Sequence, residues 1–222
     1  MGSVKAGLDD GAVSRARAAK QREENEIEFS RIVAFSDGVF AIAITLLVLQ
    51  LDVTEVSNGE LGRALLNERQ DIFAYAISFA VIGRFWIVHH HFFGEVIRFD
   101  GRLIALNLFY LAWIVLLPFS SQVLGDHGGA EAAVILYAIN LIGVILSGLL
   151  MFADAHRAGL TRASPEGIRT GRRSALVVAA VFAISIPVAV VNPQLAPYCW
   201  LILFLTPLRD LATRVRGSAQ ER

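Results

Sequence analysis

Six long apolar segments constrain the fold of this chain of 222 residues more than any other feature. Each is close to the roughly 20 residues that an α-helix needs to cross a bilayer. The six predicted spans are Ile32–Leu51, Ile72–Phe92, Leu103–Leu124, Ala132–Phe152, Ser174–Val191 and Leu195–Leu208. Only helices and closed barrels satisfy their backbone hydrogen bonds in lipid, and these runs lack the alternation of barrel strands. The sequence therefore predicts an all-α membrane protein with six transmembrane helices.

Composition agrees with a membrane protein and excludes several other classes. Hydrophobic residues make up 55% and charged residues 18% of the chain, whereas soluble domains carry about 25% charged residues. A disordered chain is excluded, because such chains are poor in apolar residues. The 20 basic residues balance the 20 acidic ones, so we expect no nucleic-acid partner held by bulk charge. The single cysteine, Cys199, excludes an intrachain disulfide and a cysteine-based zinc site.

The basic residues predict the orientation in the membrane. Seventeen of them lie in the N-terminal segment, the loops after the second and fourth spans and the C-terminal tail, against only Arg63 and Arg69 on the opposite side. Because basic loops stay in the cytoplasm, both termini of this multi-pass protein are predicted to face the cytoplasm, across the cell inner membrane. We expect a cytoplasmic extension over residues 1–30, a six-helix transmembrane domain over residues 31–211 and a cytoplasmic tail over residues 212–222.

The connecting segments carry further expectations. The N-terminal extension lacks the apolar run and cleavage site of a signal peptide, and we expect it to continue as a helix into the first span. The polar, basic segment Gly159–Arg173 is predicted to be a loop. The last two spans are short and rich in proline, so an alternative for them is one tight hairpin of bent helices.

Polar residues inside the predicted spans are candidate functional residues, since ionisable groups are costly in lipid. In the predicted topology they lie in the cytoplasmic third of the membrane; they are Arg31, Ser36, Asp37, Arg84, His89, His90, His91 and Asn107. A network joining Asp37 to Arg84, a histidine and Asn107 would let these groups satisfy one another. Long side chains near span ends can instead reach the interface, and the roles of Arg84, His90 and His91 stay open.

The three consecutive histidines do not predict a metal site. Neighbours on a helix point about 100° apart, so three in a row cannot converge on one ion. His127 and His156 are predicted to lie in loops on opposite sides of the membrane. We also see no nucleophile–base arrangement, and the sequence therefore does not predict an enzyme.

A mostly apolar stripe lies in the first predicted span, after Asp37. Ile42, Thr45, Leu46 and Leu49 have the spacing i, i+3, i+4, i+7 and share one face of the first span. In a membrane helix, a stripe with this periodicity is usually a lipid-facing or packing surface, so the periodicity alone does not indicate a function. In the fourth span, Gly143 and Ser147 form a small-xxx-small pattern that allows close helix approach, between subunits or within one.

The first three spans resemble a known family. The segment RIVAFSDGVFAIAITLL, beginning at Arg31, resembles the RxxxFSDGVFAI signature of the transmembrane protein 175 family, the endosomal and lysosomal potassium channels and their prokaryotic relatives. Trp86–Phe92 is similar to the family's W-x-x-H-H-x-x-F stretch. Leu106–Leu108 and Leu117–Phe119 are similar to its L-N-L and L-P-F landmarks. The resemblance covers about Arg31–Phe119, and the later spans agree only in hydropathy and length.

This resemblance implies a potassium-permeable cation channel that lacks the glycine-tyrosine-glycine filter loop of ordinary potassium channels. It further implies a prokaryotic homotetramer in which the first helix of each subunit lines a central pore. The expected partners are further copies of the chain, the lipid bilayer and monovalent cations. We expect no cofactor other than the permeant potassium ion.

The resemblance also implies residue roles. Ile42 would form the narrow hydrophobic constriction, Leu46 and Leu49 further rings toward the outside, and Thr45 would offer hydroxyl groups to a permeating ion. Apolar constrictions of this kind gate channels by dewetting. A network bracing the pore helix would consist of Arg31, Ser36, Asp37, Trp86, His89 and Asn107. External acidic residues would concentrate cations at the pore mouth or simply form a solvated loop; they are Asp52, Glu55, Glu60, Glu68 and Asp71.

An alternative function uses the same polar residues differently. Asp37 and His89 could relay protons in a proton-coupled secondary transporter or a proton-leak pathway. Transporters usually show Gly- or Pro-broken helices at matching positions of two halves, and this sequence shows no such pair.

Overall fold

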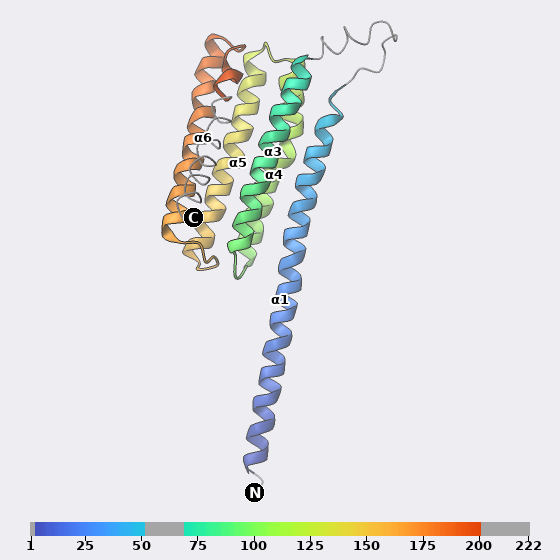
Figure 1. The fold of residues 1–222 in the computed structure, drawn as a ribbon, viewed down its shortest axis with the longest axis vertical. Coiled ribbons are helices and arrows are strands. Elements are labelled where there is room, and N and C mark those ends of the chain that lie inside the picture. The colour runs from blue at the N-terminus through green and yellow to red at the C-terminus, as the bar shows by residue number, and fades with distance from the viewer. Residues whose placement is uncertain (1–2, 52–68, 201–222) are drawn as a thin grey trace, which may run out of the picture. The chain divides into compact units, whose positions relative to one another are not determined.

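The computed structural model describes residues 3–51 and 69–200 of the chain. These residues form the helices α1 (Ser3–Val48), α3 (Arg69–Glu95), α4 (Gly101–Asp126), α5 (Glu131–Arg157) and α6 (Pro165–Val191) (Figure 1). All five contain a stretch that is long and apolar enough to cross a membrane. Residues 196–200 begin a further helix, so most of the predicted sixth span, like the tail over 212–222, lies outside the described residues. The predicted all-α membrane fold is confirmed.

Helix α6 corrects the prediction for the loop before it. The helix begins at Pro165, nine residues before the predicted start of the span, so most of Gly159–Arg173 is helical rather than a loop. Ser164 caps the helix, because its Oγ accepts a hydrogen bond of 3.1 Å from the Gly167 amide. Proline at the first helical position is favourable, since its missing N–H is not needed there. Hydropathy marks where apolar residues begin, and a helix can begin earlier.

A second correction concerns His156. It lies in the last turn of α5 rather than in a loop, whereas His127 is the residue that caps the C-terminal end of α4. Basic side chains are favourable in the last turn of a helix, where they interact with the exposed carbonyl groups.

Helix α5 lies at the centre of the bundle formed by α3 to α6. It packs against α4 on one side and α6 on the other, and α4 also packs against α3 (Figure 1). Its core positions are fully buried, among them Tyr137, Leu141 and Val144, and Ile114 and Leu117 of α4 are equally buried. Burial of an apolar side chain of this size stabilises a protein by about 1.5–3 kcal/mol relative to exposure to water. Relative to exposure to lipid, the stabilisation comes from close packing.

Gly143 shows how closely α4 and α5 approach. A Cβ atom at this position would lie 2.5 Å from the ring of Trp113 on α4, and a Cβ at Gly148 would lie 3.2 Å from Tyr110. Ser147 is buried and donates a hydrogen bond to the carbonyl of Val144 in its own helix. Of the two alternatives for the small-xxx-small pattern, the contact within the subunit is the one that the structure shows for Gly143.

The loops at the end of α3 and the end of α5 are joined by hydrogen bonds. Val96 and Thr161 form a single antiparallel β-bridge, and the amide of Arg162 donates to the carbonyl of Glu95 over 2.9 Å. Beside this connection, the guanidinium of Arg102 lies 2.9 Å from the carboxylate of Asp154. These contacts connect the α3–α4 pair to the α5–α6 pair.

Residues 1–38 and 39–222 form two units, and their boundary lies within α1. In the first unit the chain is helical from Ser3 onward, which confirms that the N-terminal extension continues as a helix into the first span. Its described side chains are mostly exposed; Lys20 and Glu24 approach to 3.7 Å at the i, i+4 spacing that stabilises a solvated helix.

Candidate pore-lining face of helix α1

Within residues 39–222, the end of α1 packs through one face. Phe40, Ala43 and Leu47 are at most 2% exposed, and their spacing places them on the same side of the helix. The ring of Phe40 lies 5.3 Å from that of His89 on α3 and 6.3 Å from that of Tyr110 on α4. This face therefore fixes the rotation of α1 about its own axis.

The opposite face of this segment carries the predicted stripe. Ile42 is 61%, Leu46 41% and Leu49 75% exposed, and Thr45 is exposed as well. The structure thus brings the four predicted residues together on one surface of the subunit. A cluster of large exposed apolar side chains marks a surface that meets lipid or another protein.

Thr45 is the polar member of this surface. Its hydroxyl group donates a hydrogen bond of 2.9 Å to the carbonyl of Ile42 in the preceding turn. Because a hydroxyl has one hydrogen and two lone pairs, this bond uses the hydrogen and leaves oxygen lone pairs on the exposed side. Such an oxygen can accept a cation.

The turn after the C-terminal end of α1 is joined to α4 by Gln50. Its side-chain amide donates to the carbonyl of Pro118 over 2.6 Å. Helix α1 ends at Val48, three residues before the predicted end of the span, and continues into a turn. Beside this contact, Leu46 and Leu49 line an open depression of about 320 Å³ against Pro118, Phe119 and their neighbours on α4.

His89 lies at the centre of the contact between α1, α3 and α4. It is 1% exposed, its ring is stacked on Tyr110 at 5.6 Å, and it lies 4.5 Å from the ring of Phe93. Its Nε2 lies 2.9 Å from the side-chain oxygen of Asn107, which is also buried. Two of the residues predicted to form the bracing network are therefore in direct contact.

The remaining predicted residues occupy different environments. Trp86 is 37% exposed, and its ring stacks on His90 at 5.4 Å. In the unit of residues 1–38, Ser36 is buried and donates to the carbonyl of Ile32, Asp37 is half-buried and Arg31 is exposed. The connection of these three to α3 and α4 stays a prediction.

A buried polar cluster between α3, α4 and α5 was not anticipated. The hydroxyl oxygen of Ser78 lies 2.8 Å from that of Ser121 and 2.9 Å from that of Tyr137, and Asn140 donates to Ser120 over 3.0 Å. Burying a hydroxyl group without a partner is costly, so these bonds specify how the three helices meet. The polar residues are visible in the sequence, but short hydroxyl side chains within apolar runs give no sign of mutual contact.

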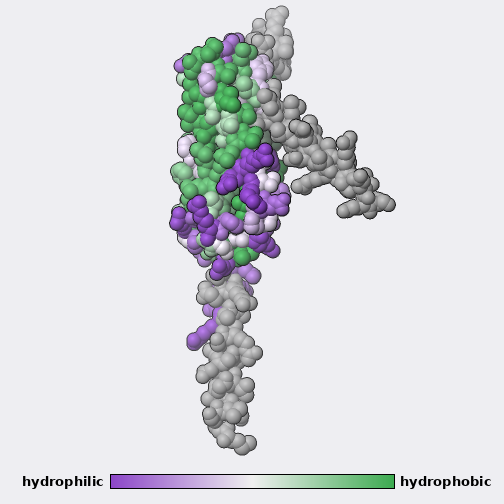
Figure 2. Space-filling model, turned by 90° about the vertical axis from the view of Figure 1, so that its left-hand side faces the viewer, coloured by the Kyte–Doolittle hydropathy of each residue, from purple (hydrophilic) through white to green (hydrophobic). Residues whose placement is uncertain are grey.

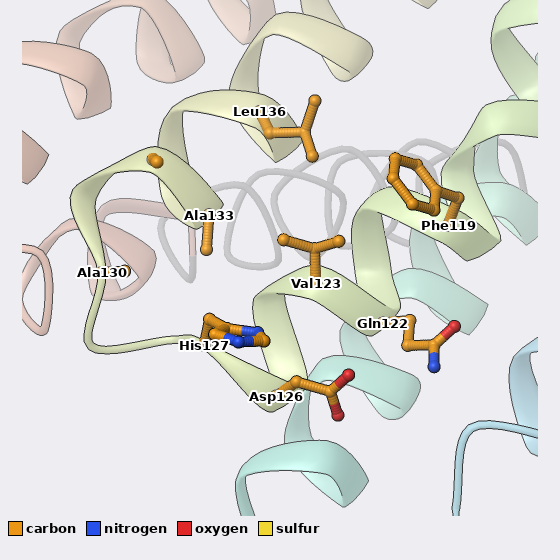
Figure 3. Close-up of a pocket in the computed structure, with 9 residues that line it drawn as sticks. Phe119, Gln122, Val123, Asp126, His127, Ala130, Ala133 and Leu136 are labelled. Carbon is orange, nitrogen blue, oxygen red and sulfur yellow. The ribbon is translucent and has the colours of Figure 1, made fainter.

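Two other kinds of candidate site, metal-binding groups and depressions in the surface, concern the rest of the described structure. Among residues 3–51 and 69–200, no group of three or more His, Cys, Asp or Glu side chains could hold a metal ion. An open depression of about 490 Å³ lies where α4 ends and α5 begins, with Asp126, His127 and Ala133 among its lining (Figure 3).

Of the predicted external acidic residues, Asp71 is half-buried, and its carboxylate packs over Gly125. Asp52, Glu55, Glu60, Glu68 and the basic Arg63 lie outside the described residues.

Comparison with known proteins shows which family the chain is similar to. The family model described as endosomal/lysosomal potassium channel TMEM175 matches residues 31–118. A potassium channel from Streptomyces collinus is 35% identical over 137 residues, which cover 60% of this chain and 66% of that protein. A potassium channel from a Chryseobacterium species is 38% identical over 112 residues, covering 50% of this chain and 57% of that protein.

Similarity at the level of the fold extends further along the chain. The crystal structure of a lysosomal potassium-selective channel TMEM175 homolog from Chamaesiphon minutus has a TM-score of 0.69 to this structure at 27% identity. The match covers 82% of this chain and 97% of the other. The chain is similar to the TMEM175 family over residues 31–118 and shares the fold of this solved homolog. The family match begins at Arg31 and ends at Pro118, so it contains the exposed stripe of α1, His89 and Asn107. The chain spans less than two thirds of either curated relative described above.

Proposed function

We propose that this chain is the subunit of a homotetrameric, potassium-permeable cation channel in which α1 lines a central pore. The observation that carries the proposal is the division of α1 into a buried face, which holds it to α3 and α4, and an exposed face of Ile42, Thr45, Leu46 and Leu49. Relatives of this chain are named potassium channels, and the same activity is assigned to this chain here.

The proposed orientation places the channel in the cell inner membrane with both termini in the cytoplasm. The distribution of Lys and Arg supports it, because basic residues gather in the N-terminal segment and in the segments that follow the second and fourth spans. The pore then runs outward from Ile42 toward Leu49.

Four copies of α1 around one axis would bring four Ile42 side chains into a ring. A ring of branched apolar side chains excludes water when it is narrow, and an ion cannot cross a dry constriction without losing its hydration. Leu46 and Leu49 would form further apolar rings one and two turns outward. Because Phe40 fixes the rotation of α1 against His89 and Tyr110, a change in this contact would turn Ile42 toward or away from the axis.

Thr45 would supply the polar ligands of the permeating ion. With its hydrogen engaged by the carbonyl of Ile42, its oxygen can face a cation, and four such oxygens would replace part of the hydration shell. One ring of hydroxyl groups replaces less of that shell than stacked carbonyl rings do, so we expect modest potassium selectivity. The permeant potassium ion is the only ion or small molecule in the proposal, which includes no resident cofactor.

The bracing role is proposed for six residues of the family signature: Arg31, Ser36, Asp37, Trp86, His89 and Asn107. The contact between His89 and Asn107 and the packing of Phe40 on His89 support this role for the part of the network in α3 and α4.

Replacing Ile42 by Asn tests the pore assignment. A polar ring hydrates the constriction, so Ile42→Asn is expected to raise potassium flux into liposomes severalfold and to weaken discrimination against sodium. The matched control is Ile44→Asn, which makes the same change at a half-buried position on another side of α1; its flux should not rise. Unchanged flux and ion discrimination in Ile42→Asn would contradict the assignment of the pore to this face.

A further inference from the structure

Helix α6 carries three arginines on one face near its beginning. Arg169, Arg172 and Arg173 have the spacing i, i+3, i+4, and Leu176 and Val177 continue the same face at i+7 and i+8. All five side chains are exposed. With a rise of about 1.5 Å per residue, the change from arginine to leucine takes place within about one turn of the helix.

This face points away from the protein core. The opposite side of α6 contains its buried residues, Phe182, Ser185 and Ala189, and Phe182 packs on Trp200 at 5.7 Å. Helix α6 packs against α5, which lies between it and α4. Figure 2 shows a largely hydrophobic surface on the α6 side of the molecule, with hydrophilic residues gathered toward the end where α6 begins.

The arginines of this face differ from Arg98, Arg102 and Arg162, at the same end of the bundle, in their electrostatic partners. Arg102 pairs with Asp154 at 2.9 Å, and Arg162 lies 3.9 Å from Glu95. Arg98 donates to the carbonyl of Gly159 over 3.5 Å. None of the ion pairs within 4.0 Å that join described residues includes Arg169, Arg172 or Arg173, although Glu166 lies one turn before Arg169 on the same helix.

We propose that Arg169, Arg172 and Arg173 form a binding site for the headgroup of an anionic phospholipid, whose acyl chains lie along Leu176, Val177 and Ile184. Guanidinium groups present paired N–H donors that match phosphate oxygens, and clusters of basic residues beside a transmembrane helix attract anionic lipids. Ile184 is 60% exposed two turns beyond Val177, so the apolar surface extends into the membrane. A soluble phosphate would use the arginines but not this apolar continuation, and we therefore assign the site to a lipid.

Thermal unfolding of the purified full-length protein in detergent micelles tests the proposal without a measurement of channel activity. Dioleoylphosphatidylglycerol is expected to raise the unfolding midpoint of the wild type by several degrees relative to dioleoylphosphatidylcholine. The triple variant R169Q/R172Q/R173Q should lose most of this shift while keeping its midpoint in phosphatidylcholine. The variant R169K/R172K/R173K should retain part of it, because lysine keeps the charge without the planar donors.

Matched controls separate a site from general charge attraction. The variant R15Q/R17Q/R22Q removes the same three charges from the N-terminal extension and should keep the full shift; an equal loss in both triple variants would overturn the proposal. Inorganic phosphate should give no comparable shift, and a shift equal to that of the lipid would overturn the assignment to a lipid. If the α6 triple variant does not fold, R169Q and R173Q should each lose part of the shift, and an undiminished shift in both would overturn the site.

Discussion

At the scale of single residues, the two faces of α1 are set by a few side chains with opposite roles. Phe40 is almost completely buried against His89 and Tyr110, whereas Ile42, two positions later, is 61% exposed. Successive positions differ by about 100° around a helix, so packing of Phe40 determines where Ile42 points. The hydrogen bond between His89 and Asn107 satisfies two polar groups that would otherwise cost about 1–3 kcal/mol each when buried.

Thr45 allows a test of selectivity at the same scale. Replacing Thr45 by Ala removes the oxygen proposed to face the ion, so the permeability ratio of potassium to sodium should fall about fivefold, the factor that corresponds to the ~1 kcal/mol of one polar contact. Reversal potentials in planar bilayers under a potassium–sodium gradient measure this ratio. Thr45→Ser keeps the hydroxyl and should keep the ratio. A ratio that is the same in Thr45→Ala and the wild type would contradict the role given to Thr45.

At the scale of helices, close packing between α4 and α5 organises the bundle. The rings of Trp113 and Tyr110 on α4 pack closely against α5 at Gly143 and Gly148, where no side chain intervenes. The hydrophobic effect does not stabilise this contact in lipid, because the surroundings are equally apolar. Shape complementarity is therefore the stabilising feature.

Two glycine substitutions measure this contact. Gly143→Ala introduces a Cβ 2.5 Å from the Trp113 ring, and the required shift of the ring should destabilise the protein by about 1–3 kcal/mol. Gly83→Ala is the matched control inside α3, where a Cβ would meet nothing within 4 Å; it should be neutral or stabilising by up to about 1 kcal/mol, because alanine favours the helix. Thermal unfolding in detergent compares the two variants. Equal stability of both would show that the α4–α5 contact is looser than described.

At the scale of the whole molecule, one subunit leaves its candidate functional surface exposed. The stripe of α1 meets no other part of residues 39–51 and 69–200 closely enough to be buried. A single helix cannot enclose a pore, so the proposed function requires several subunits, and their number is a property of the assembly rather than of one chain.

The mass of the purified protein in detergent or nanodiscs tests this requirement. Native mass spectrometry or light scattering is expected to give a particle with four copies of the chain. A protein that remains a monomer under all conditions would contradict the proposed channel, whereas a lipid effect on its stability would still support the site on α6. The two proposals can thus fail independently.

The sequence alone was sufficient for the membrane class and for the five spans within the described residues, because both depend on local hydropathy. Helical periodicity also placed Ile42, Thr45, Leu46 and Leu49 on one side of the first span, but it did not show whether that side is buried. The direct contact between His89 and Asn107 was accessible as a hypothesis, since both are polar groups at the same predicted depth of two neighbouring spans. The start of α6 was predicted wrongly, because Pro165–Arg173 is polar and yet is helical behind the cap at Ser164.

Only the tertiary structure decided which side of each helix is buried. It placed Phe40, Ala43 and Leu47 in contact with the bundle and left Ile42, Thr45, Leu46 and Leu49 outside. It also joined Ser78, Ser121 and Tyr137, and it turned Gly143 toward Trp113 within the subunit. In a membrane helix both faces are apolar, so hydropathy cannot distinguish them. The distinction comes from shape and hydrogen bonding between residues that lie far apart in the chain.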